Sequence, residues 1–153
     1  MQHSGPSPDV VSAILEDLPE WFGIPEANAA YVDAARSFDT YLALDDDGVP
    51  VGVLLLNQHF PATSEVHLIA VKRDHHRRGI GRALVAAAEA DAQARGTRLL
   101  EAKTLAASHP DTGYAATRNF YEAMGFLQLE ETDLWGEASP CLIMVKPLSA
   151  PMA

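Results

Sequence analysis

Residues 69–84 read IAVKRDHHRRGIGRAL, which has the pattern of a strand end, a basic loop with two glycines and the start of a helix. Gly79 and Gly81 allow the backbone to approach a ligand closely, and the first amides of a helix are free to bind phosphate oxygens. Five of the chain's eleven lysines and arginines fall within residues 72–82. The segment therefore predicts a site for an anionic ligand; the alternative is an ordinary glycine turn with a solvated basic face.

Two common nucleotide-binding patterns do not fit this segment. A dinucleotide fingerprint needs a third glycine, and Leu84 stands at that position. The phosphate-binding loop pattern G-x-x-x-x-G-K-S/T does not occur in the chain. The anionic ligand is therefore expected to be held in another way.

The overall composition limits the class of protein. The 153 residues are 48% hydrophobic and 21% charged, which predicts one globular domain. A net charge of -10 argues against general binding to nucleic acid or to an anionic membrane, and it favours a cationic partner. Cys141 is the only cysteine, so no internal disulfide or cysteine zinc site is expected, and no metal is predicted. No signal core or membrane-length apolar run is found, so a cytoplasmic protein is expected.

Hydrophobic periodicity predicts the order of helices and strands, an α+β or mixed α/β fold. Residues 1–7 are interpreted as a flexible tail, and residues 8–149 as a single domain. The expected helices span residues 8–18, 25–37, 79–95 and 114–124. The expected strands span residues 41–44, 49–57, 64–71, 99–105, 126–130 and 141–146.

The loop spacing also resembles a known family. His76-x-x-Gly79-x-Gly81 is similar to the pyrophosphate signature Q/R-x-x-G-x-G/A of the GNAT superfamily of acyl-CoA-dependent N-acetyltransferases, with His76 replacing the usual Gln or Arg. The resemblance implies a central sheet that is splayed between the strands ending at Val71 and starting near Leu99, with acetyl-CoA in the gap. The cofactor-binding residues that it implies are Ile69, Ala70, Val71, His76, Arg77, Arg78, Gly79, Ile80, Gly81 and Arg82.

A second segment supports the same family. Residues 117–126, TRNFYEAMGF, resemble the family pattern A-x-x-F-Y-x-x-x-G-F. The resemblance implies that Tyr121 protonates the departing thiolate as a general acid. An aromatic pair before a glycine is also typical of core packing, which is the alternative.

The base that deprotonates the amine has several candidates. Strand alternation places Glu65 and His67 on one face, and Glu65 resembles the general-base glutamate of histone-type members. The alternative for Glu65 is a salt-bridged carboxylate. His67 could replace Glu65, relay its proton or be a hydrogen-bonded core histidine. Glu101 is a third candidate, whereas His59 could line the acceptor mouth or occupy a turn, and the turn is expected.

The acceptor wall is expected, from the resemblance, in the N-terminal helices and the loop before the last strand. These segments supply Trp21, Asp133 and Trp135, and His67 is a further candidate for substrate binding. The expected reaction is direct attack by a primary amine in a ternary complex, and the net charge favours a small cationic amine over a protein N-terminus. The alternative is an acyl-CoA-binding module without catalysis. A homodimer is left open, and Cys141 is expected to pack rather than react.

Overall fold

The computed structural model describes residues 2–108 and 113–149 and divides the chain into two compact units. The first unit comprises Met1–Asn57 and Val66–Ala92, and the second comprises Gln58–Glu65 and Gln93–Ala153. The strands β3 (Pro50–Phe60) and β4 (Thr63–Val71) pass through both units. Within the described residues, no helix is both long and apolar enough to cross a membrane.

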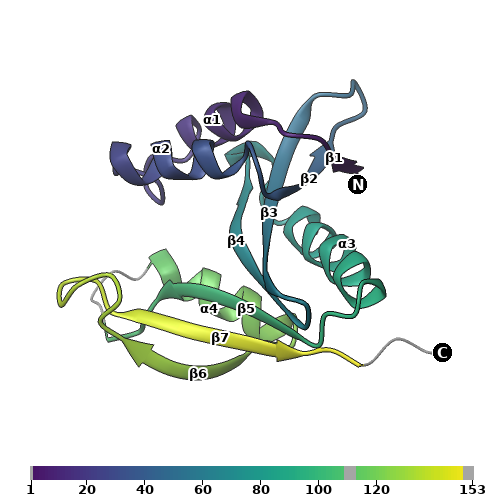
Figure 1. The fold of residues 1–153 in the computed structure, drawn as a ribbon. Helices are drawn as coiled ribbons and strands as arrows, with labels where there is room; N and C mark the ends of the chain where they lie inside the picture. Colours follow the sequence, from purple (N-terminus) through teal and green to yellow (C-terminus); the bar gives the residue numbers. More distant parts are fainter. Residues whose placement is uncertain (1, 109–112, 150–153) are drawn as a thin grey trace. The chain divides into compact units, whose positions relative to one another are not determined.

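The first unit is a sheet with helices on both faces, as Figure 1 shows. Its sheet has the order β1-β2-β3-β4, and the pairs β1–β2 and β2–β3 are antiparallel. The remaining elements are β1 (Gln2–Ser4), α1 (Pro8–Glu16), α2 (Pro25–Ala34), β2 (Asp39–Leu44), the 3-10 helix η1 (Arg73–His75) and α3 (Ile80–Ala94).

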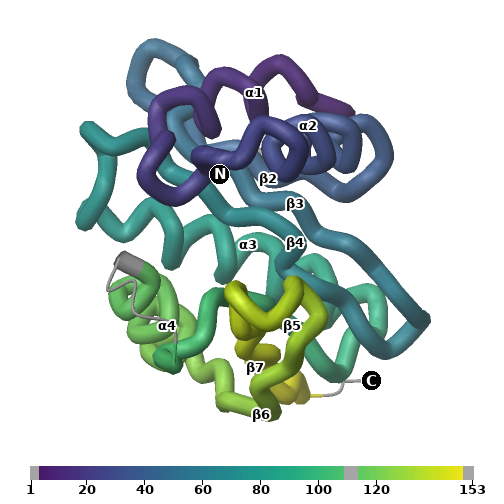
Figure 2. The backbone as a smooth tube through the Cα atoms, turned by 90° about the vertical axis from the view of Figure 1, so that its left-hand side faces the viewer, coloured from purple at the N-terminus to yellow at the C-terminus, as the bar shows by residue number. Residues whose placement is uncertain are grey.

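The two faces of this sheet pack against different helices. On one face, Ile14 and Leu15 of α1 join a buried cluster with Leu42 and Val53. Figures 1 and 2 both show α1 and α2 side by side. On the other face, the Cα of Gly52 lies so close to α3 that an added Cβ would stand 3.1 Å from Leu84. Because successive side chains of a strand face opposite sides of the sheet, β2 and β3 contribute side chains to both layers.

The N-terminal residues correct one prediction. A flexible tail was expected over residues 1–7, but Gln2–Ser4 form β1 and pair with Thr40–Leu42 of β2. The strand was missed because backbone hydrogen bonds to β2, rather than an alternating hydrophobic pattern, define it. The first two helices also end earlier than predicted, at Glu16 and Ala34.

The second unit contains β5 (Leu99–Leu105), α4 (Gly113–Ala123), β6 (Leu127–Thr132), β7 (Cys141–Pro147) and the turn between β3 and β4. Its order is β5-β7-β6, with both pairs antiparallel. The carbonyl of Ala62 accepts hydrogen bonds from the amides of Arg98 and Leu99 at 2.7 and 3.2 Å, which joins the turn to the start of β5.

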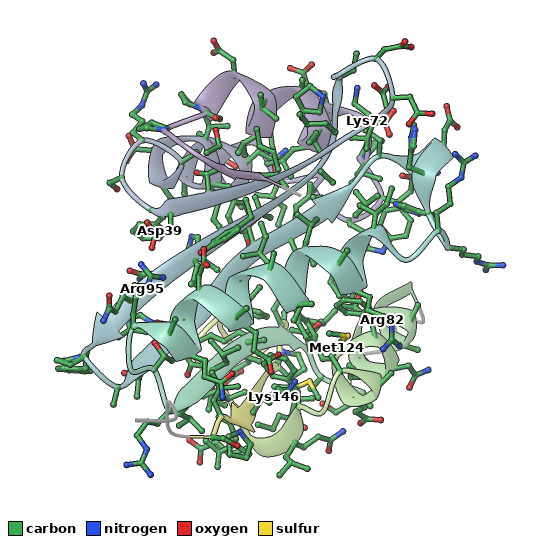
Figure 3. All side chains as sticks on the ribbon, turned by 90° about the vertical axis from the view of Figure 1, so that its right-hand side faces the viewer. Asp39, Lys72, Arg82, Arg95, Met124 and Lys146 are labelled. Carbon is green, nitrogen blue, oxygen red and sulfur yellow. The ribbon has the colours of Figure 1, made fainter. Side chains whose placement is uncertain are left out.

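The end of α4 and the bounds of β5 agree with the predictions to within one residue, whereas β6 lies over Leu127–Thr132 instead of residues 126–130. The helix α4 stops before Gly125, whose φ of 95° favours glycine, and the side chain of Lys146 lies against it. Figure 3 labels Lys146 and Met124, the residue that precedes Gly125. The strand β5 has the predicted bounds. The mixed α/β class is therefore confirmed, while the splayed gap stays a prediction.

Candidate active site

The loop after β4 leaves backbone donors available at the start of α3. It leaves the sheet near Lys72, labelled in Figure 3, whose amide donates to the carbonyl of Val51 at 2.8 Å. Gly79 has a φ of 76°, and the amide of Ala83 donates to its carbonyl at 3.0 Å. The amides of residues 80–82 precede this first helical bond, so the helix itself offers them no acceptor. Such a helix start favours an anion.

The basic side chains of this loop divide into two groups. Arg73 donates its amide to Asp17 Oδ2 at 2.7 Å and its guanidinium to Glu20. The hydrogen bond from Arg73 holds the pKa of Glu20 below its usual range. Arg73 therefore fastens the loop to the segment after α1. The second group, which is solvent-exposed, consists of Arg77, Arg78 and Arg82.

His76 also helps to hold the loop in place. Its Nε2 lies 2.6 Å from the carbonyl oxygen of Val71, to which an Nε2–H donates. Its ring stands edge-on to Trp21, with 5.7 Å between ring centroids, and the Arg73 guanidinium lies 5.9 Å from the Trp21 ring. Trp21, a predicted substrate residue, therefore contacts the loop implied in cofactor binding.

The strand β4 shows the predicted alternation next to this loop. Ala70 is buried, while His67, Ile69 and Val71 are half-buried. The ring of His67 stands edge-on to Tyr31 and Phe38, at centroid distances of 5.4 and 5.1 Å. Aromatic packing thus surrounds a ring that was considered as a base.

A charged cluster in the second unit surrounds Glu65, another candidate base. Glu65 Oε1 lies 2.8 Å from His59 Nε2, and Glu65 Oε2 lies 2.8 Å from Lys103 Nζ. Lys103 Nζ also lies 3.1 Å from Glu101 Oε1, which is 3.9 Å from His59 Nε2. We call His59, Glu65, Glu101 and Lys103 the Glu65 cluster. It contains the salt bridge that was the alternative interpretation of Glu65.

The Glu65 cluster pairs one lysine with two carboxylates in a partly buried place. Burial acts to lower the pKa of Lys103, but the hydrogen bonds and charges of Glu65 and Glu101 outweigh it and raise that pKa. Lys103 therefore stays an ammonium. His59, Glu65 and Glu101 each offer a ligand atom within 4.8 Å of the others, a spacing that a metal ion could use. Lys103 contacts both carboxylates and already supplies positive charge there.

The other predicted residues of the second unit lie in two environments. Tyr121 is 4% exposed and packs edge-on against Phe120 and Phe126. Asp133 and Trp135 are exposed in the turn before β7, where the amide of Gly136 donates to the carbonyl of Asp133 at 2.8 Å. The Trp135 ring is thus available to solvent, whereas Tyr121 belongs to a packed aromatic group.

Two members of the Glu65 cluster were not predicted from the sequence as part of a charged site, although His59 was considered for the acceptor mouth. His59 was expected in a turn, and this was wrong because β3 continues to Phe60. Lys103 was not considered. The signal that could have found it is the alternation of β5, which buries Leu100, Ala102 and Thr104 and leaves Glu101 and Lys103 together on the other face.

Comparison with known proteins identifies the family. The profile of the acetyltransferase (GNAT) family matches residues 8–126, most of the chain. The chain belongs to the GNAT family of acetyltransferases. It is therefore an acyl-CoA-dependent acetyltransferase, as the loop and α4 motifs indicated. A comparison with curated protein sequences gives no match.

Solved structures show that the GNAT fold extends over nearly the whole chain. A GNAT-family protein from Desulfovibrio desulfuricans has 22% identity and a TM-score of 0.83, with 97% of this chain and 98% of that chain covered. An aminoglycoside 6'-N-acetyltransferase in complex with coenzyme A has 20% identity and a TM-score of 0.75, with 99% and 100% covered. A GNAT acetyltransferase from Elizabethkingia anophelis with acetyl-CoA bound has 18% identity and a TM-score of 0.67, with 86% and 88% covered.

Proposed function

We propose that this GNAT acetyltransferase transfers the acetyl group of acetyl-CoA to a primary amine by direct attack, and that residues 8–149 act as one catalytic domain. The observation that carries the proposal is the start of α3, where Gly79 has a φ of 76° and the next three amides have no acceptor within the helix. Coenzyme A or acetyl-CoA is present in two of the similar structures.

The residues proposed to hold the cofactor are those of the loop and the end of β4. The side chains of Arg77, Arg78 and Arg82 and the backbone amides of residues 77–82 bind the pyrophosphate. The backbone of residues 69–71 binds the pantetheine arm and polarises the thioester carbonyl. His76 supports the loop through its bond to Val71. Acetyl-CoA supplies the activated acetyl thioester.

In this proposal, residues of the chain accept one proton from the amine and donate another to the sulfur. An ammonium has no lone pair, so the acceptor must lose a proton before it attacks. The Glu65 cluster receives that proton, with Glu65 and Glu101 as its carboxylates, and His67 is the other carrier considered. Tyr121 donates a proton to the departing sulfur through its phenol.

The proposed acceptor is a small cationic amine. The net charge of -10 attracts cations, and the exposed pair of Asp133 and Trp135 offers a carboxylate and an aromatic face to an ammonium. Trp21 and His67 are further candidates for substrate contact. One similar structure is an aminoglycoside 6'-N-acetyltransferase, a protein whose name gives an aminoglycoside as its substrate.

Two assays test the proposal together. Calorimetry measures binding of coenzyme A, and thiol release from acetyl-CoA is measured against polyamines, aminoglycosides, amino acids, arylamines and N-terminal peptides. We expect saturable release with a small cationic amine. Binding without release from any amine would instead favour a non-catalytic acyl-CoA-binding module, and absence of binding would overturn both functions.

A matched pair of glycine variants tests the loop. Gly79 and Gly48 have φ values of 76° and 80°, and nothing lies within 4 Å of a Cβ added at either position. Each change to alanine should therefore cost a similar free energy of unfolding, about 1–2 kcal/mol. We expect Gly79→Ala to weaken coenzyme A binding at least about tenfold by shifting the helix amides. Gly48→Ala should leave it unchanged, and equal binding by both variants would contradict the loop site.

A further inference from the structure

We propose that His59 is the base that takes the proton from the amine and that Glu65 is the positioning residue that holds the His59 ring. This inference rests on the proposed acetyl transfer and deepens it by naming the receiving atom, His59 Nδ1. The argument depends on the exposure of the two side chains and on the atoms that face each other in the Glu65 cluster.

Glu65 is poorly available to an incoming amine. Its side chain is 8% exposed, and its two oxygens lie 2.8 Å from His59 Nε2 and 2.8 Å from Lys103 Nζ. A direct reaction at Glu65 would have to displace one of these charge-assisted hydrogen bonds. The His59 side chain is 39% exposed, so it is the member of this pair that solvent and a small amine can reach.

The hydrogen bond to Glu65 determines which ring nitrogen of His59 can act. An ionised carboxylate only accepts hydrogen bonds, so His59 Nε2 must carry the hydrogen. Lys103 Nζ donates to the other oxygen of Glu65 at 2.8 Å, so both carboxylate oxygens act as acceptors. The neutral His59 ring consequently has its lone pair on Nδ1. This is the tautomer that a base needs, and Glu65 keeps it in place.

Two carboxylates and one ammonium surround the His59 ring. Glu65 of β4 faces the ring at 2.8 Å, and Glu101 of β5 faces it at 3.9 Å. Lys103 of β5 contacts both carboxylates and offsets one of the two negative charges. The ring therefore faces a net charge of about -1, opposite in sign to the imidazolium that forms when His59 Nδ1 accepts a proton.

The proton and electrons balance in the proposed step. The ammonium gives one proton to His59 Nδ1, and the bonding pair remains on the nitrogen as its lone pair. That pair forms the new C–N bond to the thioester carbonyl, and the C–S bond breaks with its electrons on sulfur. The second proton of the nitrogen passes to water as the amide forms, while Tyr121 protonates the sulfur and its phenolate takes a proton back from water. His59 then releases its proton to water.

The variant His59→Gln tests the step, because its side-chain amide can still donate to Glu65 but has no basic lone pair. We expect kcat/KM for a responsive alkylamine at pH 7 to fall about 10²- to 10⁴-fold. The loss should shrink as the pH rises and the alkylamine becomes neutral. An arylamine acceptor, which is already neutral at pH 7, should lose less than about tenfold, because the base then removes no proton from an ammonium.

A structural role for His59 would give a different result. Equal loss with alkylamine and arylamine at every pH would overturn the inference, as would wild-type activity in His59→Gln. If the wild-type enzyme itself shows no amine-dependent thiol release, the proposed function fails and the inference fails with it. Wild-type turnover that is unaffected by His59→Gln overturns the inference alone.

Nuclear magnetic resonance of the imidazole rings gives a second readout that needs no acceptor. Long-range proton–nitrogen spectra should show His59 as the Nε2–H tautomer at high pH. Glu65→Gln should change the chemical shifts of the His59 ring nitrogens, because the charged acceptor 2.8 Å from Nε2 is lost, and should leave those of His75 and His76 unchanged. The matched control is Glu130→Gln, which removes an exposed carboxylate on β6. An Nδ1–H tautomer, or no effect of Glu65→Gln, would overturn the inference.

Discussion

Three histidines of this acetyltransferase lie in three different surroundings, and these surroundings limit what each ring can do. The ring of His67 is packed against Tyr31 and Phe38. His76 binds the carbonyl of Val71, which occupies its Nε2. His59 has an exposed ring and pairs with a buried carboxylate, Glu65. At the scale of the residue, the partner rather than the residue type therefore decides the role.

Cys141 allows a prediction at the same scale. It is fully buried, and burial raises the pKa of its thiol, although a hydrogen bond with Thr132 acts in the opposite direction. Because the thiolate is the reactive form, we expect negligible labelling by a thiol reagent at pH 8 in the folded protein and complete labelling in denaturant. Ser37→Cys, at an exposed position, should add one rapidly labelled thiol. Rapid labelling of native Cys141 would contradict its packing role.

At the scale of the element, the strand period and the helix start place the functional groups. Alternation along β5 separates Glu101 and Lys103 from the buried side chains of that strand. The start of α3 presents backbone donors directly after Gly79. The hydrogen bond between Arg73 and Asp17 joins the loop to the end of α1. Regular elements thus position these groups, and the loop between β4 and α3 carries the anion-binding pattern.

Close packing of α3 on β3 makes a second prediction at this scale. A Cβ at Gly52 would stand 3.1 Å from both Ile80 Cγ2 and Leu84 Cδ1, so Gly52→Val must displace α3 or its side chains. We expect a loss of about 1–3 kcal/mol in the free energy of unfolding, measured by denaturant titration. The control Gly5→Val adds its Cβ where nothing lies within 4 Å and should be nearly neutral. Equal stability of the two variants would refute the close contact.

At the scale of the whole molecule, the charge is distributed unevenly along the sequence. The chain carries 21 acidic residues against 11 lysines and arginines, yet five of these bases fall within residues 72–82. The field of the whole protein therefore attracts a cation, while one segment favours an anion. This combination suits an enzyme whose two proposed substrates have opposite charges.

The dependence of kcat/KM on ionic strength tests whether the charge of the whole protein attracts the amine. We expect kcat/KM for a polyamine to fall as ionic strength rises from 0.01 to 0.2 M, because the screening length shortens from about 30 Å to less than about 10 Å. A neutral arylamine provides the comparison, and its kcat/KM should change little over the same range. A similar decline for both acceptors would show that the net charge of -10 does not guide the amine.

The sequence alone determined what depends on neighbours along the chain. Hydrophobic periods and turn residues predicted the order of elements, including the bounds of β5, and the Gly79–Gly81 pattern identified the family. Local conformation and backbone exposure are properties of a few consecutive residues, so a short motif can encode them.

Tertiary structure alone decided which distant groups meet. Gln2–Ser4 became a strand by pairing with β2, and Lys103 reached Glu65 across 38 positions of sequence. His59 acquired its exposed ring and its carboxylate partner because β3 runs on to Phe60. Periodicity indicates which face a side chain occupies, but long-range strand pairing and packing determine the charge opposite it. For this acetyltransferase, that is why the family could be predicted from sequence while the proposed base could not.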